Sequence, residues 1–418
     1  MFNNLRKISL GNWILIAMIL GIFTGIFLNV YVEDPFIDFI LMDNVFYLGG
    51  DLFIRLMKML VVPLVFCSIV MSLASVSDIR KLGTVGARSI LFFIFTNLIS
   101  IVIALVLGTI ITPGAELTVA APELASNSTG AMTLTETILN IFPENPLHAL
   151  TNGEMLPIIL FGILIGFILI KLKDETSTVY NIFDELNNLM MKLTNIIMKI
   201  APIGIFCLMA GTFGTIGFES IIPLSEFIGC IILAAAILIF VVYPIIFVIF
   251  TRANPLKFYR KFIPAMLFAF SSASSTATIP LSIEKLEEIG VSRDVSLFTI
   301  PLGTSLNKNG SVIFFTLGFM FAAQAYGIDF GAVALLTVII TILMSSISSP
   351  TVPMADFFTL VMIFNTIGLP IAILDLMIGI YNIIGMFNAL SNLTSNGICT
   401  SIVAFQYKSF DMDKFKEK

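Results

Sequence analysis

The sequence predicts an all-α polytopic membrane protein with eight transmembrane helices and two re-entrant helical hairpins. Hydrophobic residues make up 58% of the 418 residues and charged residues only 12%, whereas a soluble chain is about 25% charged. Apolar runs of about 20 residues, the length that crosses a bilayer, recur along the chain. A large soluble domain is therefore excluded. The 22 basic and 27 acidic residues nearly balance and form no basic face for nucleic acid.

The eight predicted transmembrane helices correspond to apolar runs separated by polar segments. The first run is too long for a signal-peptide core and lacks a small-residue cleavage site, so we expect it to remain as a helix. Several runs are longer than a crossing needs and contain proline, so we expect them to tilt, kink or break. The runs cover residues 13–32, 46–76, 89–112, 154–172, 188–215, 227–251, 295–326 and 366–405.

Basic residues indicate how the chain is oriented. Lysine and arginine precede the first run, follow the second, fourth and sixth runs and close the chain, while the segments between are acidic or neutral. Basic connecting segments stay on the cytoplasmic side of a membrane. We therefore expect a multi-pass protein of the cell membrane, embedded in the lipid bilayer, with both termini in the cytoplasm.

Two further segments carry a polar centre between short apolar arms. Residues 263–289 surround the serine-rich tip 271–278, and residues 330–362 repeat this plan around 345–353. Each arm is too short to span. One crossing separates the two segments, so we predict two re-entrant hairpins that enter from opposite sides.

A helix with a polar break follows each hairpin, at Asn307–Ser311 and at Ser391–Gly397. Hairpin plus broken helix, twice and with opposite topology, predicts an inverted repeat. Interrupted backbone at membrane depth is tolerated where it lines a cavity, and its helix ends offer sites for charged groups and ions. The alternative is that the serines and threonines only allow close helix packing.

The chain resembles the glutamate transporter family, the dicarboxylate/amino acid:cation symporters, as a divergent prokaryotic-type member. The resemblance covers nearly the full length, and its motifs are specific through their order and spacing. Besides the serine-rich first hairpin, they are Met59–Phe66, Asn145–Gly153, Ala201–Phe206, Phe298–Gly303 followed by Asn307–Ser311, and Ser346–Ile347 with Val352–Pro353.

The resemblance implies a homotrimeric secondary transporter, not an enzyme, in which a transport domain moves like an elevator against a trimerising scaffold. The second hairpin would serve as the gate. The implied division is scaffold helices 1 and 2 in residues 1–81, transport-domain helix 3 in 82–112, an external loop with scaffold helices 4 and 5 in 113–220, and the rest of the transport domain in 221–418.

The resemblance also implies two sets of site residues. Those expected to bind the small-molecule solute are Ser274, Ser275, Thr276, Ser311, Thr351, Val352, Asp356, Asn388 and Asn392. Those expected to hold a cation, or to take its place, are Gly303, Ser305, Asn307, Lys308, Asn309, Ser346, Ile347, Ser349 and Asn396.

This chain departs from the family pattern within the cation sites. Asn309 and Asn396 stand where the family has sodium-binding aspartates, and Lys308 replaces a methionine. Phe93 and Asn97 stand where the family has a tyrosine and a serine of another sodium site. Amides supply oxygen ligands but no charge, so we expect sodium coupling to be weakened or absent, with Lys308 as a surrogate cation. The alternative for Lys308 is a structural snorkelling role.

The solute ligands differ from the family pattern too. Asn388 stands where the family has an arginine that clamps a side-chain carboxylate, and Gly385 where it has an aspartate that pairs with the ammonium. A neighbouring threonine is Ala389, and Asp356 occupies a position normally held by glycine. An asparagine cannot reproduce bidentate recognition by arginine. Aspartate and glutamate are therefore poor candidates. For Asp356 the alternative is a place near the outer water.

The lead hypothesis is a transporter of a small polar solute, either a non-acidic amino acid or a related organic acid. The sequence does not decide whether sodium or a proton is the coupling ion, and it implies no other cofactor. The alternatives are a sodium-coupled symporter that uses Ser305, Ser346, Ile347 and Ser349 under the second hairpin, a channel, or a non-transporting sensor. A single histidine and four cysteines in apolar runs argue against metal or catalytic chemistry. Five acidic residues at arm or helix ends are read as solvated: Glu284, Glu287, Glu288, Asp294 and Asp375.

Overall fold

The computed structural model describes residues 10–31, 41–74, 85–117, 139, 142–152, 155–172, 175–216, 221–349 and 354–416. Every regular element within these ranges is a helix, and one isolated antiparallel bridge joins Val291 to Phe410. The predicted all-α class is confirmed for this part of the chain.

The N-terminal half consists of helices that coincide with the first five predicted apolar runs and two short additions. They are α1 (Leu10–Tyr31), η2 (Leu41–Phe46), α3 (Tyr47–Ala74), α5 (Ala87–Ile111), α7 (Pro146–Asn152), α8 (Met155–Lys171), α9 (Ser177–Met198) and α10 (Ala201–Ile216). The single run predicted at 188–215 is divided between α9 and α10, whose axes differ by 55°. Pro202 lies in the first turn of α10, where a proline has no helical hydrogen bond to lose.

The C-terminal half contains the remaining three runs and both predicted hairpin segments. Its helices are α11 (Ile221–Ile237), η6 (Leu238–Val242), α12 (Tyr243–Thr251), α13 (Pro255–Ser272), α14 (Ile279–Ile289), α15 (Arg293–Leu306), α16 (Asn309–Ala325), α17 (Ala332–Ser348), α18 (Ala355–Ile367), α19 (Leu374–Gln406) and α20 (Met412–Lys416). The π-helical turn η6 continues α11 directly into α12.

Three helical segments among the described residues are long and apolar enough to cross a membrane. They are Ala87–Ile111, Ile222–Thr251 and Leu374–Gln406, and the bent pair α9–α10 gives a fourth if it counts as one span. The other predicted runs are helical as well, but they do not reach the same length and apolar composition within the described ranges. The count of eight crossings therefore stays a prediction.

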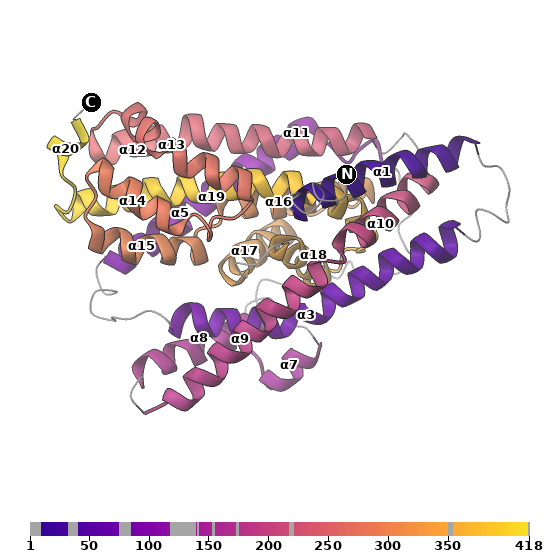
Figure 1. The fold of residues 1–418 in the computed structure, drawn as a ribbon, viewed down its shortest axis with the longest axis horizontal. Coiled ribbons are helices and arrows are strands. Elements are labelled where there is room, and N and C mark those ends of the chain that lie inside the picture. The colour runs from indigo at the N-terminus through magenta and orange to yellow at the C-terminus, as the bar shows by residue number, and fades with distance from the viewer. Residues whose placement is uncertain are drawn as a thin grey trace, which may run out of the picture.

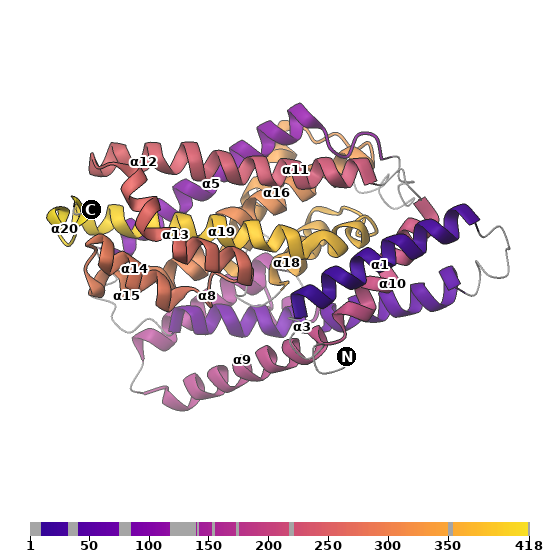
Figure 2. The ribbon, with the colours of Figure 1, turned by 45° about the horizontal axis from the view of Figure 1, so that its top comes forward.

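The helices form two groups, which Figures 1 and 2 show from two directions. In the first group α1 packs along α10, and α3 packs against α8, α9 and α10. In the second group α19 is surrounded by α5, α11, α13, α15 and α16. Helices α17 and α18 lie between the groups and contact α3 on one side and α16 on the other.

Two glycines explain how closely α1 and α10 approach. A Cβ atom at Gly21 would stand 2.7 Å from the carbonyl oxygen of Phe206, and one at Gly25 would stand 2.6 Å from that of Ala210. Neither distance is tolerated by real side chains. Small residues spaced by four along an apolar helix thus allow direct contact between the two backbones.

Two pairs of helices occupy the segments predicted as hairpins. The first helix pair, α13 and α14, is joined by the turn 273–278, and α13 begins eight residues earlier than expected because Asn254 caps it. The Asn254 Oδ1 accepts a 2.9 Å hydrogen bond from the Leu256 amide. The second helix pair, α17 and α18, is joined through 349–354, of which 350–353 lie outside the described residues. Re-entry into a membrane stays a prediction for both pairs.

The first predicted polar break is present and the second is wrong. Helix α15 ends at Leu306 and α16 begins at Asn309, so the chain is interrupted at Asn307 and Lys308. Helix α19, in contrast, runs unbroken through 391–397. Asn392, Ser395 and Asn396 bond groups outside α19. Thr394 donates to the Leu390 carbonyl four residues earlier, a bond that a continuous helix accommodates.

The C-terminal segment, residues 407–416, folds back onto the first helix pair. The Asp411 amide donates to the Gly290 carbonyl at 2.8 Å, and the Ser292 amide donates to the Ser409 carbonyl at 2.9 Å. The side chain of Phe415, 1% exposed, packs against Phe410 with 5.4 Å between ring centroids. This segment therefore covers the connection between α14 and α15.

Candidate functional site

The break between α15 and α16 is a buried polar element in an apolar surrounding. Asn307 and Asn309 are fully buried and Lys308 is 4% exposed. The Asn307 amide still donates to the Gly303 carbonyl at 2.7 Å, and the Lys308 carbonyl accepts from the Val312 amide at 2.9 Å. The backbone on both sides is thus satisfied, and the three side chains between them need other partners.

Asn307 links three helices through its side-chain amide. Its Nδ2 donates to Ser395 Oγ and Asn396 Oδ1 of α19, both at 2.8 Å. Its Oδ1 accepts a 3.1 Å hydrogen bond from Thr96 Oγ1 of α5. Gly303 makes room for this arrangement, because a Cβ atom there would stand 2.6 Å from Asn396 Oδ1.

Asn309 forms a second amide contact with α5. Its Nδ2 donates to Asn97 Oδ1 at 3.0 Å and to Ser100 Oγ at 3.2 Å. Two atoms of this network are left over: Asn309 Oδ1 and Asn396 Nδ2 are buried and have no hydrogen-bond partner within the described part of the chain. Asn307 therefore bonds Asn396, and Asn309 bonds Asn97. We call these four asparagines, together with Thr96, Ser100 and Ser395, the amide network.

Lys308 reaches across to the second helix pair. Its Nζ donates to the carbonyl oxygen of Ser349, the residue that ends α17. The carboxyl end of a helix carries a partial negative charge and attracts a cation. The same contact makes the ammonium a tie between the break and the turn of the second helix pair.

Asp356, in the first turn of α18, is held by side chains of three other elements. Its Oδ2 accepts from Ser311 Oγ of α16 at 2.7 Å and from Asn388 Nδ2 of α19 at 3.2 Å. Its Oδ1 accepts from Ser349 Oγ at 3.1 Å. Asp356 is thus half-buried and bonded, and Ser349 contacts both it and Lys308.

Asn392 completes this group from α19. Its Nδ2 donates to Ser311 Oγ at 3.2 Å, and its Oδ1 accepts from the Gly310 amide at 2.8 Å. Four residues expected to bind solute, Ser311, Asp356, Asn388 and Asn392, therefore meet in one polar cluster. We call these four residues together with Ser349 and Lys308 the central cluster.

Other expected site residues make only local hydrogen bonds. Ser274 Oγ accepts from the Ala277 amide at 3.2 Å inside the turn 273–278, where Ser275 and Thr276 are half-buried. Ser305 and Ser346 donate to carbonyls of their own helices, at 3.3 Å and 2.7 Å. Ile347 is half-buried at the end of α17. Thr351 and Val352 lie outside the described residues.

The turn of the first helix pair nevertheless lies beside α19. A Cβ atom built at Gly385 would stand 3.9 Å from the Cβ of Ala273, and the rings of Phe270 and Phe387 meet edge to face at 5.2 Å between centroids. Gly385 precedes Asn388 by about one helical turn. The turns of both helix pairs thus approach the same stretch of α19.

Three residues of the amide network were missed by sequence reasoning: Thr96, Ser100 and Ser395. Thr96 and Ser100 are spaced by four in a largely apolar helix, so they share one face. That spacing was a usable signal. Ser395 lay in a predicted break, which hid its role as a side chain on a continuous helix.

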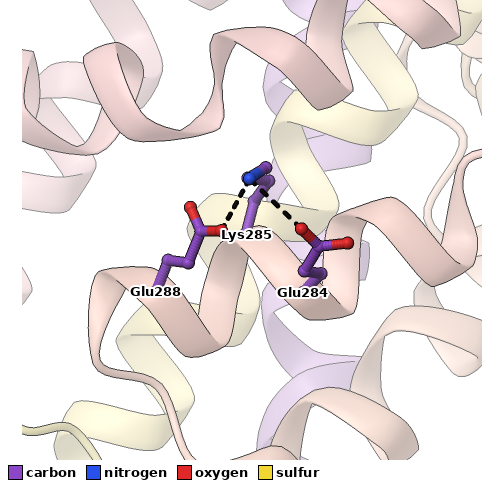
Figure 3. Close-up of polar contacts among 3 residues, drawn as sticks. All are labelled: Glu284, Lys285 and Glu288. Carbon is purple, nitrogen blue, oxygen red and sulfur yellow. Dashed lines mark hydrogen bonds and ion pairs between the residues drawn. The ribbon is translucent and has the colours of Figure 1, made fainter.

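Glu284, Lys285 and Glu288 of α14 form a separate polar group (Figure 3). Lys285 Nζ lies 2.6 Å from Glu288 Oε1 and 3.3 Å from Glu284 Oε1, and the two carboxylate side chains are 50% and 63% exposed. The hydrogen bond that Lys285 donates to Glu288 raises the pKa of Lys285 above its usual value. Glu284 and Glu288 are thus exposed, as expected for a solvated face, whereas Glu287 is half-buried and lies 3.3 Å from Arg293.

No group of three or more histidine, cysteine or acidic side chains that could hold a metal occurs among the described residues. The four cysteines, all within those ranges, are free thiols buried in apolar surroundings. Oxygen ligands of the central cluster and the amide network are therefore the groups that remain for binding ions or solutes.

Comparison with known proteins agrees with this architecture. The sequence model of the sodium:dicarboxylate symporter family matches residues 10–405. A proton/sodium-glutamate symport protein of Geobacillus stearothermophilus is 31% identical over 421 residues, which cover 99% of this chain and 98% of the relative. A proton/glutamate-aspartate symporter of Escherichia coli (strain K12) is 30% identical over 98% of this chain and 95% of its own length.

A third relative is a C4-dicarboxylate transport protein 2 of Polaromonas naphthalenivorans (strain CJ2). It is 30% identical over 381 residues, which cover 88% of this chain and 84% of the relative. These relatives are membrane transporters and not enzymes. With a family match that spans nearly the whole chain, this protein belongs to the sodium:dicarboxylate symporter family.

Proposed function

We propose that this protein is a secondary transporter that moves a small polar, non-acidic solute by an elevator mechanism. The observation that carries the proposal is the carboxylate of Asp356, which is bonded to Ser311 and Asn388 at positions expected to bind solute. The relatives are named as carriers of glutamate, aspartate or C4-dicarboxylates. In this chain the side-chain carboxylate of Asp356 already lies among the residues that are expected to bind the solute.

A second carboxylate from the solute would be repelled there. Two like charges 4 Å apart repel by about 4 kcal/mol at an effective dielectric constant of 20. That energy corresponds to roughly a thousandfold loss of affinity. An acidic amino acid or dicarboxylate is therefore disfavoured relative to a non-acidic amino acid or a related monocarboxylic acid.

Sodium coupling is proposed to be weakened or absent, with Lys308 acting as a built-in cation. The ammonium of Lys308 bonds the Ser349 carbonyl, an oxygen that a sodium ion under the second helix pair would otherwise use. In the amide network, Asn396 Oδ1 already accepts a 2.8 Å hydrogen bond from Asn307 Nδ2. A tethered cation stabilises the site but cannot be released on one side, so it cannot couple transport to a sodium gradient.

The two helix groups support the proposed elevator. Helices α1, α3, α8, α9 and α10 form the proposed scaffold, and α5 with α11–α19 forms the proposed transport domain. The scaffold would trimerise within the cell membrane, with both termini in the cytoplasm. Because α17 and α18 contact α3 as well as α16, they are placed to serve as the gate.

One observation favours a second candidate, a symporter that still uses sodium. Asn309 Oδ1 is a buried oxygen without a hydrogen-bond partner among the described residues, and sodium takes such oxygens as ligands. A sensor or channel built on the same fold would differ from either candidate in flux: a sensor binds without transport, and a channel does not saturate.

The test is solute uptake into proteoliposomes with the sodium gradient imposed, abolished and reversed. The proposal predicts saturable uptake and counterflow of a non-acidic solute that are insensitive to the direction of the gradient. The same experiment with a proton gradient decides whether protons drive transport. Strict dependence on sodium that persists unchanged in Lys308→Met would contradict the proposal and support the second candidate.

A further inference from the structure

We infer that Asp356 and Asn388 form a subsite for a primary ammonium group, so that the solute is a zwitterionic amino acid without net charge. The inference rests on the proposed transport function and names the solute class for that same site. In this subsite, the carboxylate that binds the ammonium is that of Asp356, in α18 of the second helix pair.

The first support is an unused acceptor at Asn388. This side chain is 3% exposed, and its Nδ2 donates to Asp356 Oδ2 at 3.2 Å. Its Oδ1 is buried and has no donor within the described part of the chain. A buried acceptor without a donor is costly. Because Nδ2 and Oδ1 belong to one amide, the unused oxygen lies next to the carboxylate.

The second support is that Asp356 accepts hydrogen bonds and donates none. Its carboxylate accepts from Ser311, Asn388 and Ser349, and the Tyr381 side chain bonds it as well. An ammonium can take the place of these neutral donors, because a hydrogen bond between two charged groups is stronger than one from a neutral donor. An ammonium carries three donors and no acceptor, so it matches a place that offers only acceptors.

The third support is charge balance. Lys308 and Asp356 carry opposite charges, and both contact Ser349. A zwitterion placed between them aligns its ammonium with Asp356 and its carboxylate with Lys308. A solute with a net charge leaves one charge in the site without a counterpart.

Gly385 indicates why the ammonium needs this subsite. By resemblance, this position is where other family members carry the aspartate that pairs with the ammonium. Here a Cβ atom would already be 3.9 Å from Ala273 and 3.7 Å from the ring of Tyr381. The position offers no carboxylate, and Asp356 is the acidic side chain that the structure brings to the neighbouring turn of α19.

The experiment compares matched solutes on the purified full-length protein by calorimetric titration and thermal shift. The probes are glycine, L-alanine, L-serine and L-leucine, each with the hydroxy acid and the amine of the same skeleton. At least one amino acid is expected to bind, and its hydroxy acid and its amine to bind at least about tenfold more weakly. L-Lysine and L-ornithine test whether a side-chain ammonium serves instead, in which case they bind more tightly than the neutral amino acids.

The key variant is Asp356→Asn, which keeps the side-chain shape and removes the charge. Binding of the amino acid should weaken about tenfold to a hundredfold, and its preference over the hydroxy acid should disappear. Asn388→Leu should reduce the same preference and provides a second variant if Asp356→Asn does not fold. Asp294→Asn, at an exposed position of α15, is the matched control and should bind like the unaltered protein.

Three results would overturn the inference. The hydroxy acids could bind as tightly as the amino acids, or no probe with an ammonium group could bind. The third is a preference for the amino acid over its hydroxy acid that survives in both variants. Failure of the proposed function is seen separately, in proteoliposomes. There, strictly sodium-driven uptake of L-aspartate, or no flux at all, contradicts the transport proposal, while the binding series still decides the inference.

Discussion

The two helix pairs are attached to the rest of the chain in different ways. The first pair is held at its base, where Lys257 and Lys261 of α13 donate to the carbonyls of Lys416 and Lys414 at 2.6 and 3.1 Å. The buried ring of Phe415 adds an apolar contact there. The second pair is held at its turn, by Lys308 on the Ser349 carbonyl and by donors to Asp356.

Because they are attached differently, we expect the second helix pair to open more readily than the first. Backbone pairing and apolar burial at the base do not depend on the solute, so the first pair is held throughout. The contacts at the turn of the second pair involve charged groups that a solute can replace. A region whose contacts can be exchanged for a ligand is the one that can open. The proposed gate is therefore the second pair.

The largest expected effect comes from Phe415→Ala, which breaks the attachment of the first pair. Removal of a buried phenylalanine ring should cost about 3–5 kcal/mol of unfolding free energy. Hydrogen exchange should accelerate in α14 and leave α18 unchanged. Tyr407→Ala, at a less buried position of the same segment, is the control. Equal acceleration in both pairs would contradict the difference between them.

The next effect is expected for Lys308→Met, which breaks the attachment of the second pair. Loss of the buried ammonium leaves the Ser349 carbonyl without its charged donor, which should cost about 2–3 kcal/mol of unfolding free energy. Here exchange should accelerate in α18 and not in α14. The double variant Lys308→Met, Asp356→Gly should lose less stability than the sum of the single variants. Additive losses would show that the two charges are not coupled.

Asn396→Ala sharpens the comparison because the amide network touches neither turn. The change leaves the Asn307 Nδ2 donor with one acceptor fewer and should cost about 2 kcal/mol of unfolding free energy. Hydrogen exchange should rise where α5 meets α15 and α19, with both helix pairs unaffected. Faster exchange in α18 would mean that the network also holds the gate.

The smallest effect is expected for the charges on α14, and it depends on pH. The hydrogen bond that Lys285 donates to Glu288 raises the pKa of Lys285 in the folded protein. Its contribution is therefore fully present below the unfolded pKa of about 10.4 and is lost as the pH rises through the higher folded value. Thermal melts of the protein and of Lys285→Met should converge only above that pH. A difference that is constant with pH would exclude this ion pair as its cause.

Much of the fold follows from local sequence patterns, because a run of about 20 apolar residues has to form a helix to satisfy its backbone away from water. The serine-rich and proline-containing turns likewise ended the arms of both helix pairs near the predicted positions. The break at 307–308 was predicted from the same kind of polar residues that wrongly predicted one at 391–397. Local composition did not distinguish them.

The site was predictable only residue by residue. Resemblance singled out Ser311, Asp356, Asn388 and Asn392, and the structure brings these four together. The resemblance did not reveal that the Asp356 carboxylate would accept hydrogen bonds from Asn388 and Ser311. Nor did it reveal that Thr96 and Ser100 of α5 bond the break. Their spacing marks one face of α5, but the element that packs on that face lies more than 200 residues away and has no local signal in the sequence.

The amino-acid sequence by itself determined that this chain is helical and apolar, where its helices turn, and which unusual charges and amides it carries. Only the tertiary structure decided what those groups do. Polar side chains between helices choose partners across space, and each choice depends on which neighbour satisfies the buried group at the least cost. That is why Asn396 sits in an unbroken helix as a partner for Asn307, and why Lys308 and Asp356 meet at Ser349.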